Sequence, residues 1–169
     1  DPLMAGMSEE GHPYNGTLYP GIMVTAEGPK IVEYNARQGD PESQVLLPRL
    51  KSDLYEVTRA AARGGLASME VRWSSRPSVG IVIASRGYPE SFETGLAIRG
   101  LDTVDRDVLV FHAGMKSAGG GFVTSGGRVC TVVAMGDTME EARAIAYDNA
   151  RRITFENAYY RTDIALEAV

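Results

Sequence analysis

The sequence predicts an α+β protein in which a short antiparallel sheet with helices is followed by a small antiparallel β domain covered by one helix. Two strand-like runs joined by a Gly-Pro turn lie near the start, and helix signals follow them. Short apolar runs separated by glycine turns then alternate along most of the second half. Near the end comes a long helical pattern that opens with a capping box.

Composition limits the classes of function. The 169 residues are 44 % apolar, enough for a real core, and the net charge of −5 without any basic cluster argues against nucleic acid as a partner. Cys130 is the single cysteine, so no intramolecular disulfide forms and a reducing compartment is expected. The sequence has no apolar run of about 18 residues and no leader pattern, so we expect a soluble cytoplasmic protein without a membrane partner.

The first 40 residues are expected to form a helix and a hairpin. A helix over residues 1–11 should end at Gly11. Residues 16–25 read as a strand with a bulge at Pro20-Gly21, and residues 31–37 read as its antiparallel partner across a Gly-Pro turn. Helix signals then follow in the chain.

The strand over residues 31–37 carries the chemistry. Because side chains alternate faces along a strand, Glu33, Asn35 and Arg37 should share one side. Carboxylate and amide oxygens suit Mg²⁺ or Mn²⁺, and a guanidinium beside them could bind a carboxylate or phosphoryl group. The same alternation is also typical of any half-solvated strand, and spacing alone does not decide between the two interpretations.

Asp40-Pro41-Glu42 is typical of a helix start, with Asp40 either capping the helix or contacting substrate. A second helix over residues 53–63 should be capped by Ser52 and ended by Gly64-Gly65. Its apolar stripe should be core. The stripe consists of Leu50, Leu54, Val57 and Ala61.

The second half should form an antiparallel sheet folded over on itself, with Ser125-Gly126-Gly127 as a hairpin turn. The glycine clusters at 119–121 and 126–127 fit turns better than phosphate loops, because neither has P-loop spacing. Thr138 and Glu141 open a helix that should cover this sheet. The expected strands are residues 79–84, 96–98, 108–112, 121–124 and 128–135.

Motifs along nearly the whole chain resemble one enzyme family. The most specific is Arg37-x-Gly-Asp-Pro-Glu-x-Gln44, which directly follows Glu33-x-Asn35. Together they resemble the C-terminal part of the phosphoribosylamine–glycine ligases, also called glycinamide ribonucleotide synthetases, which are ATP-grasp enzymes of purine biosynthesis. The other matching segments are residues 16–19, 21–23, 48–54, 87–89, 111–114, 126–129 and 161–164.

The resemblance implies the C-terminal part of an ATP-grasp domain over residues 1–66 and a small C-terminal domain, a barrel-like or hybrid antiparallel sheet plus helix, over residues 67–169. It implies a ligase that uses ATP as co-substrate to join glycine to 5-phosphoribosylamine through glycyl phosphate. Glu33 and Asn35 would hold Mg²⁺ or Mn²⁺, Arg37 would be catalytic and substrate-binding, and Asp40 would bind substrate. A missing N-terminal part of the same enzyme would be a partner, and the fragment alone would be inactive.

Two departures and two alternatives accompany this resemblance. Gln38 stands where the family usually has an aromatic residue, and residues 19–23 offer no further acidic metal ligand of the kind found in the broader superfamily. One alternative is another ATP-grasp carboxylate–amine ligase, against which the Gly39-Asp40-Pro41-Glu42 segment argues. The other is a non-catalytic module that keeps this fold.

Overall fold

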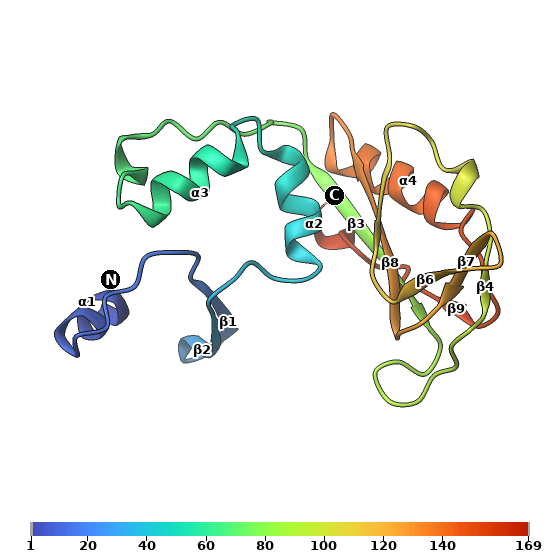
Figure 1. The fold of residues 1–169 in the computed structure, drawn as a ribbon, viewed down its shortest axis with the longest axis horizontal. Coiled ribbons are helices and arrows are strands. Elements are labelled where there is room, and N and C mark those ends of the chain that lie inside the picture. The colour runs from blue at the N-terminus through green and yellow to red at the C-terminus, as the bar shows by residue number, and fades with distance from the viewer. Residues whose placement is uncertain (1, 169) are drawn as a thin grey trace. The chain divides into compact units, whose positions relative to one another are not determined.

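A computed structural model describes residues 2–168, and the chain divides into two compact units. The first, called here the hairpin unit, comprises the described residues up to Asp40 together with Leu50–Trp73. The second, the sheet unit, comprises Pro41–Arg49 and the described residues from Ser74 onward. Helices and antiparallel sheets occur together, which confirms the predicted α+β class (Figure 1). Every helix within residues 2–168 is too short or too polar to cross a bilayer.

The hairpin unit begins with α1 (Pro2–Glu9) and the antiparallel pair β1 (Tyr19–Thr25) and β2 (Gly28–Asn35). The register shifts between Gly21 and Ile22, which confirms the bulge predicted beside Pro20. Strand β2 ends at Asn35, two residues earlier than predicted, because the backbone bends at residues 36–37. The antiparallel hairpin itself is confirmed.

Helix α3 (Leu54–Ala62) is capped by Asp53, whose carboxylate accepts a hydrogen bond from the Glu56 amide at 3.1 Å. The predicted cap, Ser52, was wrong, since its hydroxyl accepts from the Arg72 amide at 2.8 Å. Gly64 follows in the left-handed region at φ +70°, as a helix-ending glycine should. The expected core stripe was also wrong: no residue of α3 is buried, and Leu54 is 44 % exposed.

The sheet unit holds two antiparallel sheets. The larger has the order β5-β8-β3-β9 and the smaller β4-β7-β6. Strands β6 and β9 were not predicted, because Met-Lys-Ser-Ala has little apolar pattern and a two-residue strand has none. The strands are β3 (Ser78–Ser85), β4 (Ala97–Ile98), β5 (Leu109–His112), β6 (Met115–Ala118), β7 (Gly121–Thr124), β8 (Arg128–Met135) and β9 (Ala158–Tyr159).

Both glycine clusters lie in turns, as predicted, but the hairpin is at the other cluster. Ser125-Gly126-Gly127 connects β7 to β8, which lie in different sheets, so the hairpin prediction there was wrong. The hairpin is β6–β7, and Gly119 and Gly120 turn it with φ of +57° and +82°. Positive φ at both central residues is what a tight two-residue hairpin needs, and it explains the glycines without a phosphate.

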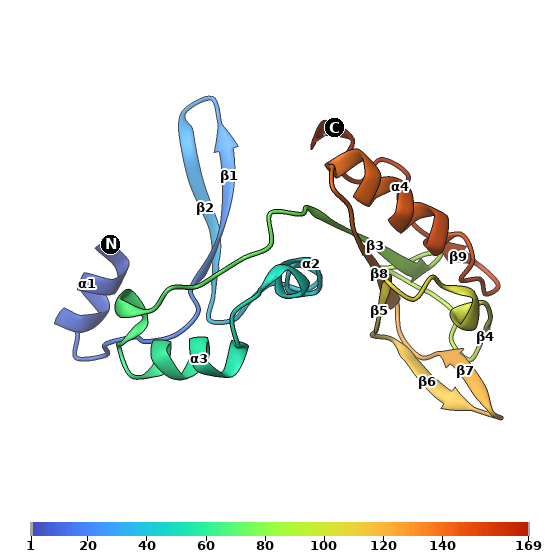
Figure 2. The same ribbon diagram turned by 90° about the horizontal axis from the view of Figure 1, so that it is seen from above.

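Helix α4 (Met139–Ala150) covers one face of the larger sheet, as predicted (Figure 2). Thr138 caps it by accepting from the Glu141 amide at 3.1 Å. Fully buried Ala142 and Ala146 let the helix approach Ile81 and Ile83 of β3. Burying one such isoleucine contributes about 1.5–3 kcal/mol, so this layer is the main source of stability in the unit.

Helix α2 (Glu42–Leu46) and the 3-10 turn η1 (Leu47–Arg49) belong to the same unit, and α2 contacts β3 and β8. Pro41 is at the N-cap position of α2, and Asp40 directly precedes it. Further 3-10 turns are η2 (Leu66–Ser68) in the hairpin unit, and η3 (Leu101–Thr103) and η4 (Leu166–Ala168) in the sheet unit.

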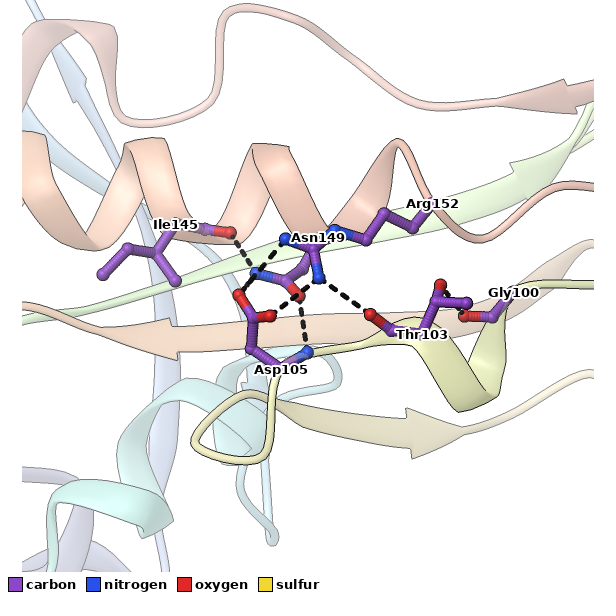
Figure 3. Close-up of polar contacts among 6 residues, drawn as sticks. All are labelled: Gly100, Thr103, Asp105, Ile145, Asn149 and Arg152. Carbon is purple, nitrogen blue, oxygen red and sulfur yellow. Dashed lines mark hydrogen bonds and ion pairs between the residues drawn. The ribbon is translucent and has the colours of Figure 1, made fainter.

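A polar network ties the loop after η3 to α4 (Figure 3). Asn149 is 1 % exposed; its amide oxygen accepts from the Asp105 backbone amide at 2.8 Å, and its nitrogen donates to Asp105 Oδ2 and to the Ile145 carbonyl. Arg152 donates to Asp105 Oδ1 and to the Thr103 carbonyl, both at 2.7 Å. These contacts hold the pKa of the Asp105 carboxyl below its usual range, through Arg152 first and Asn149 second. Every polar atom of the Asn149 amide is thus satisfied.

Replacing Asn149 with alanine should lower the free energy of unfolding by about 1–3 kcal/mol, because it leaves the Asp105 amide without its acceptor. Denaturant unfolding measures this. Asp148→Ala is the matched control on the same helix, since Asp148 is exposed and pairs only with Arg151, and it should change stability by less than about 0.5 kcal/mol. Equal losses in both variants would contradict the structural role of the network.

The thiol of Cys130 should resist modification in the folded protein. Cys130 lies in β8 with no exposed surface, and burial raises its pKa to about 12. The thiolate that reacts is therefore absent at pH 8, so a chromogenic disulfide reagent should label the protein only after denaturation. Rapid labelling of the native chain would contradict this burial.

Candidate metal and substrate site

The hairpin places the two predicted metal ligands side by side. In the register of β1 and β2, Glu33 lies opposite Gly21 and Asn35 opposite Tyr19. The Asn35 Nδ2 donates a hydrogen bond to Glu33 Oε1 at 2.9 Å, so the two side chains share one face of the strand. This contact is the geometry that a two-residue spacing on a strand predicts.

Gly21 keeps the space beside Glu33 open. A Cβ built at Gly21 would lie 3.1 Å from Glu33 Cγ and crowd the stem of that side chain. The sequence indicates Gly21 only as part of a bulge. Its role in leaving room for Glu33 becomes visible only once the cross-strand partner is known.

Glu33 has no basic partner in the described part of the chain. Its side chain is exposed, and its one polar contact is the hydrogen bond from Asn35. A carboxylate fixed for stability alone would more often face a lysine or arginine, whereas this one keeps acceptor capacity on both oxygens. Glu33 can therefore bind a metal cation without first breaking an ion pair with a lysine or arginine.

Arg37 lies just past the end of β2, in the bend. Its Nη1 donates to the Gln38 carbonyl at 2.9 Å, and the guanidinium pairs with no carboxylate in residues 2–168. Arg37 makes no hydrogen bond to Glu33 or Asn35. Asp40 follows three residues later as an exposed residue at the junction with α2. A hydrogen bond thus joins Glu33 to Asn35 directly, whereas Arg37 donates to the neighbouring Gln38 carbonyl instead.

The donor set fits a hard divalent cation. Glu33 supplies carboxylate oxygens and Asn35 an amide oxygen, which a half-turn of the amide would bring toward the carboxylate in place of the nitrogen. No cluster of three or more His, Cys, Asp or Glu side chains able to hold a metal occurs among residues 2–168. A metal here would therefore complete its coordination with water and phosphate oxygens, as Mg²⁺ commonly does.

Two other candidates for a functional contact, His112 and Gly126, have packing roles instead. The His112 ring packs edge-on against Phe122 with centroids 5.1 Å apart. Gly126 lies against Gly114, where a Cβ on Gly114 would be 2.7 Å from Gly126 Cα. This close crossing of two chain segments explains Gly126 without a bound phosphate.

The hairpin also exposes apolar side chains. Met23 and Val32 are more than half exposed, and Val24 is 86 % exposed. An isolated two-stranded hairpin is marginally stable in water, and such a surface is typical of a strand pair that packs against further protein.

Comparison with known proteins shows which family the chain is similar to. The family model described as "Phosphoribosylglycinamide synthetase, C domain" matches residues 78–167, and the one described as "Phosphoribosylglycinamide synthetase, ATP-grasp (A) domain" matches residues 1–43. The phosphoribosylamine–glycine ligase of Caldanaerobacter subterraneus subsp. tengcongensis is 46 % identical over 164 residues, which are 97 % of this chain and 39 % of the relative. That of Caulobacter vibrioides is 47 % identical over 171 residues, 99 % of this chain and 40 % of the relative.

A solved structure is similar over nearly the same extent. The crystal structure of the phosphoribosylamine–glycine ligase from Thermotoga maritima aligns with a TM-score of 0.81 at 39 % identity, covering 94 % of this chain and 39 % of that one. The chain therefore spans about two fifths of the length of these relatives. Because the C-domain model alone matches more than half of its residues, this chain belongs to the phosphoribosylglycinamide synthetase family.

Proposed function

We propose that this chain is the C-terminal part of an ATP-dependent ligase that joins glycine to 5-phosphoribosylamine in purine biosynthesis. The relatives that match nearly its whole length are named phosphoribosylamine–glycine ligases, which supports the proposal. The observation that carries it is the contact between Glu33 and Asn35 on an exposed strand face, with the guanidinium of Arg37, which has no carboxylate partner in residues 2–168, two residues further along the chain.

Each residue has a distinct role in this proposal. Glu33 and Asn35 hold Mg²⁺ or Mn²⁺, which when bound neutralises the charge of the ATP phosphates. Arg37 binds the glycine carboxylate and stabilises the negative charge of the phosphoryl group as glycyl phosphate forms. Asp40 contacts substrate. No protein nucleophile is needed, because the amine of phosphoribosylamine attacks the activated carboxyl carbon and phosphate leaves.

The domain assignment belongs to the same proposal. Residues 1–66 form the C-terminal part of the ATP-grasp domain and residues 67–169 the small C-terminal domain. The N-terminal part present in the longer relatives supplies the rest of the nucleotide site, so the chain by itself should not turn over ATP. The exposed apolar side chains of the hairpin support such a partner.

Two other functions give different results in the same assay. Another ATP-grasp carboxylate–amine ligase would use ATP and metal in the same way but would accept a different acid or amine. A non-catalytic module of this fold would show no metal-dependent ligation with any substrate. Ligation by a full-length enzyme carrying this sequence, measured with glycine and phosphoribosylamine, separates the three.

In that full-length enzyme, Glu33→Gln and Asn35→Ala should each lower kcat/KM for ligation at least about tenfold, or roughly 1.4 kcal/mol of transition-state stabilisation. The loss follows from a weakened metal, so raising the Mg²⁺ concentration should partly restore activity. ADP formation in the presence of glycine and phosphoribosylamine is the measurement.

Glu27→Gln is the matched control. Glu27 is an exposed acid in the turn of the same hairpin that pairs with Lys30, and its loss should leave ligation unchanged. Full ligation by the double variant Glu33→Gln with Asn35→Ala would show that these residues do not hold the metal.

A further inference from the structure

Arg37 lies just beyond the paired part of the hairpin, at the end where the chain enters β1 and leaves β2 (Figure 2). The last pair in the register is Tyr19 of β1 with Asn35 of β2. Continuing the same register would set Arg37 opposite Thr17. Arg37 therefore lies two residues past the last pair that the strand ladder fixes, and its position depends on other contacts.

Tyr14 connects the two chain segments at this end of the hairpin. Its hydroxyl donates a hydrogen bond to the Thr17 carbonyl at 2.7 Å and a longer one to the Ala36 carbonyl at 3.5 Å. The carbonyl oxygen of Ala36 and the backbone nitrogen of Arg37 belong to one planar peptide group. A contact that holds this oxygen therefore also holds the backbone from which the Arg37 side chain extends.

The approach of the Tyr14 hydroxyl depends on a glycine. A Cβ built at Gly16 would lie 3.1 Å from Tyr14 Oη and 3.3 Å from Tyr14 Cζ, closer than ordinary van der Waals contact. A side chain at residue 16 would thus push the phenol ring away from the two carbonyls. Tyr14, Gly16 and Arg37 all belong to the hairpin unit, as do Glu33 and Asn35.

We propose that Tyr14 is a positioning residue for ligation, which holds the Ala36–Arg37 peptide through its hydroxyl and so sets where the Arg37 guanidinium lies. This inference rests on the proposed role of Arg37 in binding the glycine carboxylate. Because a displacement of about 1 Å in a substrate-positioning group can cost about 100-fold in rate, the loss of one hydroxyl contact is enough to weaken the use of glycine. Glu33 and Asn35 lie within the paired part of β2, so the binding of metal and Mg-ATP should not depend on this hydroxyl.

The test is Tyr14→Phe in a full-length enzyme carrying this sequence. The change removes only the hydroxyl, and kcat/KM for glycine should fall about fivefold while KM for Mg-ATP stays within about twofold. ADP formation at varied glycine and at varied Mg-ATP measures both constants. Rates are expressed per Mg-ATP-binding site, so that a smaller amount of folded enzyme is not counted as slower turnover.

Tyr55→Phe is the matched control. Tyr55 lies on α3 of the same unit and is 69 % exposed, so the loss of its hydroxyl should leave both constants unchanged. This control shows whether the removal of any phenol hydroxyl from the hairpin unit affects ligation.

A double-mutant cycle with Arg37→Lys distinguishes positioning from a general effect on the hairpin. Lysine keeps the positive charge but lacks the planar fork of arginine, so Arg37→Lys alone should lower kcat/KM for glycine about tenfold. In that background Tyr14→Phe should cost less than about twofold, because the group that the hydroxyl positions is already gone. Residues that act independently would instead show the same fivefold loss in both backgrounds.

The outcomes separate this inference from the function it rests on. If Arg37→Lys lowers ligation but Tyr14→Phe keeps full kcat/KM for glycine, the positioning role is rejected and the proposed function stands. If the constants for glycine and Mg-ATP change together, or the loss is the same in both backgrounds, the hydroxyl does not act through Arg37 and the inference is overturned. Full ligation by Arg37→Ala rejects the proposed role of Arg37 itself.

Discussion

Antiparallel pairing of β1 with β2 is the constraint on which the candidate site depends. Backbone hydrogen bonds between the strands fix the direction of every side chain on β2, so Glu33 and Asn35 are held on one face. A shift of the register by one residue would send both to the opposite face. The bulge at Gly21 belongs to the same constraint, because it sets a residue without a side chain opposite Glu33.

In the sheet unit, one helix packs on each face of the strands β3 and β8. On one face the small side chains of α4 allow close packing on isoleucine and valine, and this layer is the core. On the other face Val45 of α2 packs over Gly80 of β3. The first contact forms the core of the unit, and the second seats a short helix on its other face. Arg143 and Tyr147 add contacts from α4 to the backbone of residues 161–164, which fasten the tail.

Local signals predicted elements well where the pattern lies within a few residues. The capping box of Thr138 and Glu141, the bulge next to Pro20 and the strand over residues 128–135 follow from such patterns and are confirmed. The same reasoning failed where the outcome depends on distant partners. Ser125-Gly126-Gly127 looks like a hairpin turn, but the pairing of β8 with β3, more than 40 residues away in sequence, takes β8 into another sheet. The apolar stripe of α3 was expected to be core, yet no residue of α3 is fully buried and Leu54 is exposed.

The candidate site was predictable to the level of which residues share a face, since the period of a strand is two. The contact between Glu33 and Asn35 agrees with that argument, whereas the position of Arg37 does not follow from it, because the strand ends first. The roles of Gly21 and Gly80 could not be read from the sequence, because each depends on a side chain that approaches from another strand or helix.

The most direct measurement is anomalous diffraction from Mn²⁺ in crystals of a full-length enzyme with this C-terminal sequence, grown with ADP. The account predicts a manganese peak about 2.0–2.4 Å from a carboxylate oxygen of Glu33 and from the amide oxygen of Asn35. A metal that binds the nucleotide but lies out of reach of both side chains would contradict it.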